Sequence, residues 1–121
     1  MIAYDHIQLA IPVGGEIAAR LFYGTTLGLV EQPKPAELAA RGGCWFAHGT
    51  VKLHLGVDPE FHPSRKAHLA FAIEDFSGLA VRLRAAGATL EPATPLDGRD
   101  RYYTNDPFGN RLEFIAAGTK R

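Results

Sequence analysis

The chain has 121 residues and carries thirteen basic side chains against thirteen acidic ones. This length fits one domain that can bury a core without disulfides, and the apolar content of 46% argues against disorder or a coiled coil. The formal net charge is zero and no basic run is present, so we see no electrostatic reason to expect nucleic acid or an anionic membrane as a partner.

The N-terminal segment and the single cysteine indicate the cellular compartment of the protein. Residues 1–6 lack the basic start and long apolar core of a signal peptide, and no apolar stretch has the length of a membrane span. Cys44 has no partner for a disulfide, no base beside it in the sequence, and aromatic neighbours at Trp45 and Phe46. We therefore expect a cytoplasmic protein in which Cys44 is a strand residue in a reducing compartment.

The first half of the chain predicts one helix and four strands. A short apolar run that begins with His6 indicates a buried strand, and a helical pattern follows over about 16–27. The helix is expected to end at Gly28, because a residue there needs a left-handed conformation. Three further strand-like runs, the last two joined by a turn at 48–49, cover residues 29–33, 43–47 and 51–55.

The second half repeats this order. An apolar run that begins with His68 is followed by a helix that Asp75 or Ser77 can cap and that ends at Gly87. A turn over 106–110 has strong signals, because proline presets φ and both glycine and asparagine tolerate positive φ. The remaining strand-like runs cover residues 89–92, 101–104 and 111–115.

Helical spacing predicts which side chains of the two helices face the core. Ile17 and Leu21 share one face of the first helix, with Phe22 as a further candidate, and Leu79, Leu83 and Ala86 recur on one face of the second.

Both halves therefore follow the order β-α-β-β-β, which predicts an α+β fold. We expect one domain over 1–121, with a first module at 1–57, a linker at 58–66 and a second module at 67–117. One such module cannot bury the face of its own sheet, so the two copies should pack as a curled mixed sheet around a shared cleft.

Four side chains that can bind metals occupy matching places in the two modules. His6 and His68 begin the first strand of each module, whereas His54 and Glu113 lie within the last strand, 48 and 45 residues further on. Strand alternation places His54 and Glu113 opposite their apolar neighbours. Imidazoles with a carboxylate suit zinc, nickel, manganese, iron or cobalt and leave positions free for water or substrate.

Each of these residues also has a simpler interpretation. A single histidine on a strand is more often a hydrogen-bonded structural residue, and Glu113 alone would suit a surface carboxylate. The matched set of four favours a divalent metal site. His48, at a turn, and His62, in the linker, are expected to be solvated.

Over nearly its whole length the sequence resembles the vicinal oxygen chelate superfamily, which includes glyoxalases, bleomycin resistance proteins and dioxygenases. The match depends on DHIQLA at 5–10, Phe-Tyr at 22–23 before Leu-Gly-Leu at 27–29, and above all DPFGNRLEF at 106–114. The resemblance implies the glyoxalase/bleomycin resistance fold, in which paired modules curl around a metal. It also implies a homodimer with two sites, as single-domain members of this length commonly form.

The same resemblance places His6, His68 and Glu113 on metal-ligand positions. His54 falls where glyoxalase I enzymes carry a further glutamate. An imidazole there makes the metal centre more positive and removes one candidate base, which argues against ordinary methylglyoxal–glutathione isomerisation. His54 is thus a candidate fourth ligand, a group behind the ligands, or a substrate contact.

The favoured hypothesis is a metal-dependent, glyoxalase-like enzyme of the lyase or isomerase type. Its cation would polarise a small substrate with vicinal oxygens, and Glu113 is the first candidate for moving the proton, with His54 second. Arg101 and Tyr103, two residues apart on one strand, share a face and could orient an anionic or carbonyl group. Equally, Arg101 could be a surface residue and Tyr103 could pack in the sheet.

Two other functions compete with this hypothesis. The first is a metal-free protein that binds a drug or another small ligand, as bleomycin-sequestering members of the superfamily do. Four matched metal-capable residues argue against it. The second is thiol transfer to an epoxide antibiotic such as fosfomycin, which usually needs a potassium-binding loop that the sequence does not show.

Overall fold

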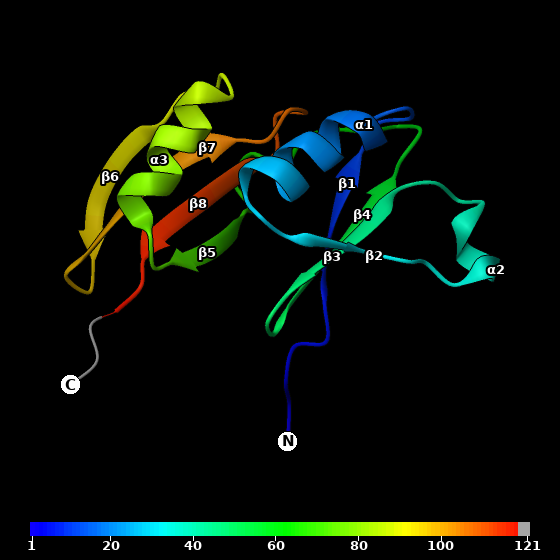
Figure 1. Cartoon of the computed structure of the whole chain (residues 1–121), viewed down its shortest axis with the longest axis horizontal. Coiled ribbons are helices and arrows are strands. Elements are labelled where there is room, and N and C mark those ends of the chain that lie inside the picture. The colour runs from blue at the N-terminus through cyan, green and yellow to red at the C-terminus, as the bar shows by residue number, and fades with distance from the viewer. Residues whose placement is uncertain (119–121) are drawn as a thin grey trace. The chain divides into compact units, whose positions relative to one another are not determined.

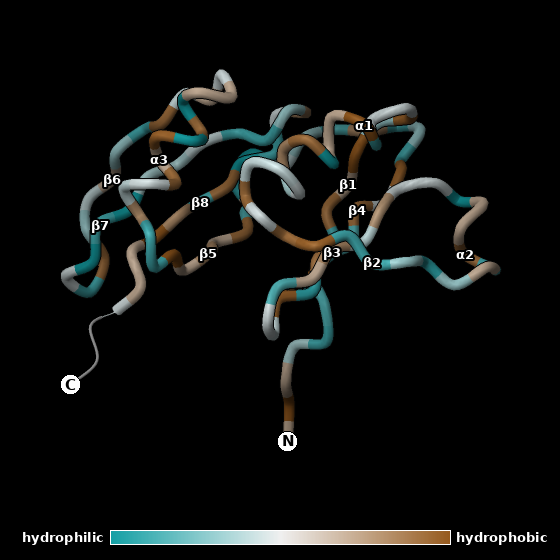
Figure 2. Tube along the Cα trace, in the orientation of Figure 1, coloured by the Kyte–Doolittle hydropathy of each residue, from teal (hydrophilic) through white to brown (hydrophobic). Residues whose placement is uncertain are grey.

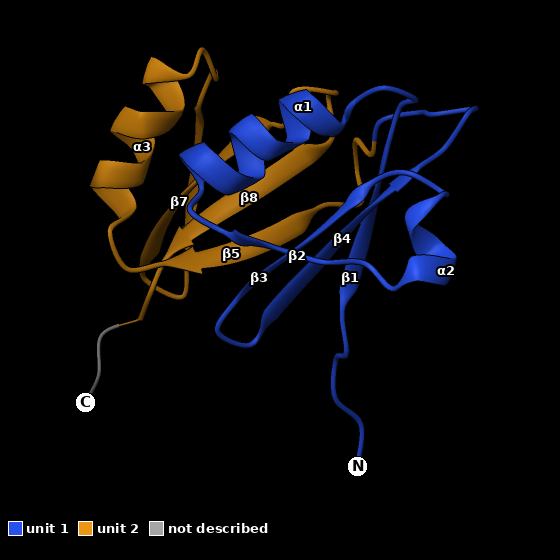
Figure 3. Ribbon diagram, turned by 45° about the vertical axis from the view of Figure 1, so that its right-hand side comes forward, with its two compact units in different colours: residues 1–63 blue, residues 64–121 orange. Residues whose placement is uncertain are grey.

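The computed structural model describes residues 1–118. The chain forms two compact units, Met1–Pro63 and Ser64–Arg121, which are coloured separately in Figure 3. Each unit contains one four-stranded mixed sheet and its own helices (Figure 1).

Unit 1 contains a sheet with the strand order β1-β4-β3-β2. β1 runs parallel to β4, and the other neighbours are antiparallel. Its elements are β1 (Ile7–Ile11), α1 (Glu16–Ala19), the π-helix η1 that continues α1 (Arg20–Thr26), β2 (Val30–Gln32), α2 (Ala36–Ala39), β3 (Cys44–His48) and β4 (Val51–Val57).

Unit 2 repeats this topology, with the order β5-β8-β7-β6 and β5 parallel to β8. Its elements are β5 (Leu69–Ile73), α3 (Phe76–Ala85), β6 (Glu91–Leu96), β7 (Arg99–Asn105) and β8 (Arg111–Ala116). The predicted β-α-β-β-β order is confirmed in both units, and the short helix α2 is an addition that the sequence pattern did not indicate.

The face predicted for the first helix is confirmed at Phe22 but wrong at Ile17 and Leu21. Ile17 and Leu21 are 74% and 61% exposed, whereas Ala19, Phe22 and Tyr23 are buried. The buried positions follow the spacing i, i+3, i+4 and so form one face of the helix. Tyr23 packs against Phe22 and approaches Phe46 of β3 (ring centroids 6.2 Å apart), so the aromatic pair occupies the side toward the sheet and turns Ile17 and Leu21 outward.

The second helix agrees better with its prediction. The carboxylate of Asp75 accepts a hydrogen bond from the backbone N–H of Gly78 and caps the start of α3. Leu79 and Leu83 are buried as predicted, while Ala86 at the end of the helix is exposed. Gly87 has φ of 91°, the left-handed conformation expected where the helix ends.

The last strand of each unit separates core residues from residues on the opposite face. Leu53 and Leu55 of β4 are buried, as are Leu112 and Phe114 of β8, and Figure 2 shows β8 as a largely hydrophobic strand. Since side chains alternate along a strand, His54 and Glu113 point away from these core residues. The alternation predicted for both positions is confirmed.

Gly43, just before β3, is held in a conformation that only glycine adopts easily. Its φ is +81°, and a Cβ there would lie 2.1 Å from the backbone oxygen of Leu55. Its N–H donates to the Glu16 carboxylate at 2.8 Å, and this hydrogen bond holds the pKa of Glu16 below its usual value. The hydrogen bond between Gly43 and Glu16 thus joins the start of α1 to the start of β3.

Two further expectations concern Cys44 and membranes. Cys44 is buried on β3, and burial raises the pKa of its thiol to about 11, as suits a core residue rather than a nucleophile. None of the helices in residues 1–118 has the length and hydropathy needed to cross a bilayer.

Candidate functional site

The turn before β8 positions the residues of unit 2. The carboxylate of Asp106 accepts hydrogen bonds from the N–H groups of Phe108 and Asn110, both at 2.9 Å. The side-chain oxygen of Asn110 accepts a hydrogen bond from the backbone N–H of Ser64 at 3.0 Å. The backbone N–H of Arg111 donates to the backbone oxygen of Ser64 at 2.8 Å. The most distinctive motif of the sequence therefore ties the segment that leads to His68 onto the start of β8.

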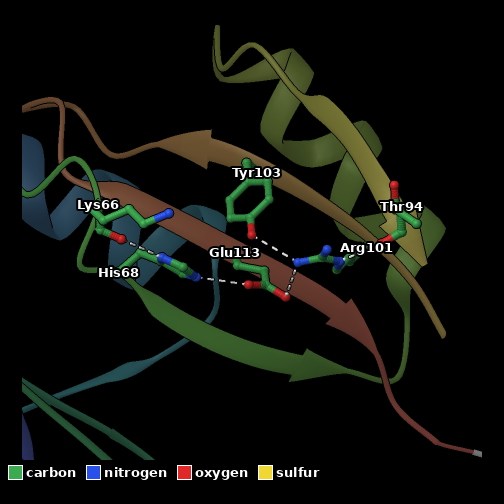
Figure 4. A network of polar contacts seen from close by, with 6 residues as sticks. All are labelled: Lys66, His68, Thr94, Arg101, Tyr103 and Glu113. Atoms are coloured by element: carbon green, nitrogen blue, oxygen red, sulfur yellow. Dashed lines mark hydrogen bonds and ion pairs between the residues drawn. The ribbon is translucent and has the colours of Figure 1, made fainter. Parts of the chain in front are cut away.

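His68 and Glu113 lie together in unit 2 (Figure 4). His68 comes one residue before β5, and Glu113 pairs in register with Ala70, two residues after His68. The atoms His68 Nε2 and Glu113 Oε1 are 2.9 Å apart. The two side chains are therefore in direct contact within this unit.

The backbone fixes which nitrogen of His68 faces the glutamate. The Nδ1 atom of His68 lies 2.9 Å from the backbone oxygen of Lys66, and because a carbonyl only accepts, Nδ1 carries the hydrogen. In the neutral ring Nε2 is then an acceptor that faces a carboxylate oxygen. These two atoms could both bind one cation.

Arg101 and Tyr103 of β7 complete the group around Glu113 (Figure 4). Nη1 of Arg101 donates to the hydroxyl of Tyr103 at 2.9 Å and lies 3.4 Å from Oε2 of Glu113, while Nε donates to the backbone oxygen of Thr94 at 2.7 Å. The guanidinium of Arg111 lies 4.0 Å from the centre of the Tyr103 ring. The Arg101 side chain is 19% exposed, and the Tyr103 ring packs against His68 while its hydroxyl belongs to the polar group.

These neighbours determine the charge of Glu113. Burial alone would raise the pKa of the carboxyl, but the hydrogen bond with His68 and the charge of Arg101 outweigh it, so the pKa lies below its usual value. Glu113 is therefore ionised at neutral pH, with one oxygen facing His68 and the other facing Arg101.

Unit 1 holds the matching pair, His6 and His54, in a different arrangement. The ring of His54 stacks on Trp45 of β3, with centroids 3.9 Å apart and planes within 4°, and on His6 at 4.2 Å and 21°. Nδ1 of His6 donates to the carboxylate of Asp5 at 2.8 Å, which leaves its Nε2 as the free nitrogen. Both predicted histidine ligands are thus held through Nδ1.

The stack borders a cavity of about 590 Å³. Besides the three rings, Gln8 and Lys52 line it. Burial, together with the neighbouring His6, lowers the pKa of His54 below its usual value, so this ring is uncharged at neutral pH.

The predicted ligands are therefore found as two pairs, one in each unit. His6 and His54 belong to unit 1, whereas His68 and Glu113 belong to unit 2. Within residues 1–118, no group of three or more histidine, cysteine, aspartate or glutamate side chains is arranged to hold a metal ion. His48 and His62 are exposed, as expected.

Three groups that contact these side chains were missed in the sequence: in unit 1 the Asp5 carboxylate and the Trp45 ring, and in unit 2 the Lys66 carbonyl. Trp45 could have been found from the predicted turn, because pairing His48 with Val51 places Trp45 opposite His54. The carbonyl of Lys66 has no sequence signal, since every residue carries one.

Comparison with known proteins identifies the family. A model of the glyoxalase-like domain matches residues 14–115. The chain belongs to this family. No curated protein sequence matches this glyoxalase-like chain.

Solved structures agree with the glyoxalase-like fold. A Bacillus anthracis protein assigned to the glyoxalase family is 42% identical with a TM-score of 0.91, over 98% of this chain and 97% of that one. A glyoxalase/dioxygenase from Nostoc punctiforme is 28% identical with a TM-score of 0.74, over 96% and 92%.

One protein of similar structure was solved with ligands. It is a mutant of the fosfomycin resistance protein FosX from Listeria monocytogenes, in complex with Mn(II) and 1S,2S-dihydroxypropylphosphonic acid. It is 17% identical with a TM-score of 0.80, over 98% of this chain and 95% of that one, and so shows a shared fold.

Proposed function

We propose that this chain is a metal-dependent enzyme of the lyase or isomerase type that acts on a small substrate with two adjacent oxygen atoms. His68 and Glu113 would supply two ligands of the cation, and His6 a third. The observation that carries the proposal is the orientation of the two imidazoles: both Nδ1 atoms bond to oxygen acceptors, so on each ring Nε2 is the nitrogen left for a metal, and Nε2 of His68 faces the Glu113 carboxylate.

The donor atoms of unit 2 fit a transition metal. Two neighbouring ligands with bonds of about 2.0–2.2 Å lie roughly 3 Å apart on one ion, and the distance from His68 Nε2 to Glu113 Oε1 is 2.9 Å. Imidazole and carboxylate donors suit zinc, nickel, manganese, iron and cobalt alike. An oxygen acceptor behind each imidazole is the usual support of a metal-binding histidine.

Glu113 is the proposed proton carrier. A divalent cation bound at this site would act as a Lewis acid toward the two substrate oxygens. Glu113 is ionised at neutral pH and can accept a proton, while Arg101 near Oε2 stabilises the charged form. His54, uncharged at neutral pH, is the second candidate for this role.

Arg101 and Tyr103 would orient an acidic group of the substrate. The guanidinium is held by the Thr94 carbonyl and the Tyr103 hydroxyl, so its direction is set before a ligand arrives. We therefore favour a substrate in which the adjacent oxygens lie beside an acid group. The compound bound to the FosX mutant combines two such features, a diol and a phosphonic acid, on a protein of the same fold.

Metal binding is the direct test. Protein purified without chelator should contain a transition metal by elemental analysis, and the stripped protein should bind Co²⁺ in calorimetric titration. His6→Ala, His68→Ala and Glu113→Gln should each lose most of this affinity, whereas His48→Ala and His62→Ala, at exposed histidines, should bind as the wild type does.

The competing candidate is a metal-free binding protein. The flat Trp45–His54 stack beside a cavity of about 590 Å³ would suit a planar ligand. A wild-type protein that contains no transition metal and gains no thermal stability from Co²⁺, Mn²⁺, Ni²⁺ or Zn²⁺ would overturn the enzyme proposal in favour of this one.

A further inference from the structure

His54 stands in a column of three stacked rings. Trp45 and His54 are direct cross-strand partners on β3 and β4, and their planes are nearly parallel. His6 lies two residues before Gln8, which pairs in register with His54, so its ring comes to rest on the other face of the imidazole. Trp45 thus covers one face of the His54 ring, and His6 covers the other.

This stacking opposes a shared metal ion. A histidine binds a metal in the plane of its ring, through a nitrogen lone pair, at about 2.0–2.1 Å. The rings of His6 and His54 lie face to face, 4.2 Å apart and inclined by only 21°, so their planes meet well beyond that bond length. One ion therefore cannot lie in both planes unless the stack is broken.

The stack does restrain the ring of His6. Its other restraint is the hydrogen bond from Nδ1 to Asp5, whose side chain is 85% exposed to solvent. A hydrogen bond to such an exposed carboxylate holds a ring weakly, because water competes for both groups. Contact with a flat face that is itself held by Trp45 fixes the tilt of the ring and hence the direction of Nε2.

The equivalent position in unit 2 is used differently. Glu113 pairs with Tyr103 as His54 pairs with Trp45, but it directs an oxygen at Nε2 of its histidine. The edge-to-face contact between Tyr103 and His68, at 5.3 Å and 79°, leaves that oxygen room. The two copies of the module thus place a donor atom at one histidine and a flat surface at the other.

We propose that His54 is a positioning residue, not a metal ligand: it is a flat spacer, backed by Trp45, that aims Nε2 of His6 at the cation. This inference rests on the proposed metal site and adds a role for Trp45, which has no metal-binding atom. The positioning role requires the flat ring of His54 but not its nitrogen atoms.

The test compares His54→Phe, which keeps a flat ring without nitrogen, with His54→Ala, which removes both. Co²⁺ affinity is measured by calorimetry and the coordination geometry by the visible absorption of bound Co²⁺. His54→Phe should keep the wild-type affinity and spectrum. His54→Ala should bind Co²⁺ roughly 10-fold more weakly or worse, with an altered spectrum, as other losses of support behind a ligand do.

Trp45→Leu gives an independent reading should a change at His54 affect folding. It leaves every nitrogen and oxygen donor in place, so a ligand role for His54 predicts unchanged Co²⁺ binding, whereas a positioning role predicts weaker binding. His48→Phe, at an exposed histidine at the end of β3, is the matched control, and thermal melts report the folding of each variant.

The outcomes separate this inference from the proposed function. If wild-type protein does not bind Co²⁺, the metal site itself fails. If wild type binds and His54→Phe loses Co²⁺ as fully as His6→Ala, His54 is a ligand and the positioning role is overturned. Wild-type binding and spectra in both His54→Ala and Trp45→Leu would overturn it as well.

Discussion

At the residue scale, the hydrogen bond from His6 to Asp5 bears on the proposed metal site. It holds Nδ1 and leaves Nε2 free. Asp5→Ala should therefore weaken Co²⁺ binding by roughly 10-fold, the usual cost of losing an acceptor behind a metal-bound histidine. Asp58→Ala, at an exposed aspartate in the segment after β4, serves as the control and should bind normally. Equal affinities in calorimetry would show that Asp5 does not support the site.

Arg101 bears on the class of substrate. Its guanidinium is held by Thr94 and Tyr103, close to Glu113. The metal-loaded protein should bind glycolate, which has two adjacent oxygens and an acid group, more tightly than the neutral ethylene glycol. Arg101→Met should weaken glycolate binding by roughly 10-fold or more, because a charge-assisted hydrogen bond is lost.

The control for this measurement is Arg84→Met, at an exposed position of α3. Unchanged glycolate affinity in Arg101→Met, measured by displacement titration, would exclude Arg101 from the substrate contacts.

At the scale of elements, the turn between β7 and β8 holds unit 2 together. Asn110 is 1% exposed, donates to Asp106 from its side-chain nitrogen and accepts from Ser64 with its oxygen. Asn110→Ala should lower the free energy of unfolding by about 2 kcal/mol, because it leaves buried groups unpaired. Denaturant titration checks this value, and Asn105→Ala, at an exposed position of β7, should cost far less.

The contact between α1 and the start of β3 gives a pH dependence. Since the N–H of Gly43 lowers the pKa of Glu16 in the folded state, the ionised carboxylate stabilises the fold above its usual pKa of 4.5. This stabilisation, on the order of 1 kcal/mol, is lost as pH falls from there through the folded-state pKa.

Glu16→Gln keeps an acceptor for Gly43 but removes the titration. Its free energy of unfolding should consequently fall less than that of the wild type on acidification, in chemical denaturation followed at a series of pH values. Parallel curves for the two proteins would contradict the assignment.

Sequence periodicity predicted most of the elements, and strand alternation predicted the faces of His54 and Glu113. It did not predict the rotation of the first helix, because Ile17 and Leu21 compete with Ala19 and Tyr23 for the buried side, and only three-dimensional packing decides between them. Spacing likewise paired each histidine with its partner but could not distinguish a stacked pair from a hydrogen-bonded one.

For the whole molecule, the expected assembly is a homodimer with one ion per chain. Each chain carries one His6, one His68 and one Glu113, and Ile17 and Leu21 form an exposed apolar stripe one helical turn apart. Light scattering should give twice the mass of one chain, and elemental analysis one metal per chain. A monomer at micromolar concentration would contradict the dimer.

The two units share one topology but do not tolerate the same substitutions. Arg101 lies two residues before Tyr103, and the matching place in unit 1, two residues before Trp45, is Gly43. Any side chain at Gly43 would collide with the Leu55 carbonyl. Unit 1 therefore cannot acquire a counterpart of Arg101 by a point mutation. Of the two units, unit 2 alone has room for a cationic side chain at this place in the module.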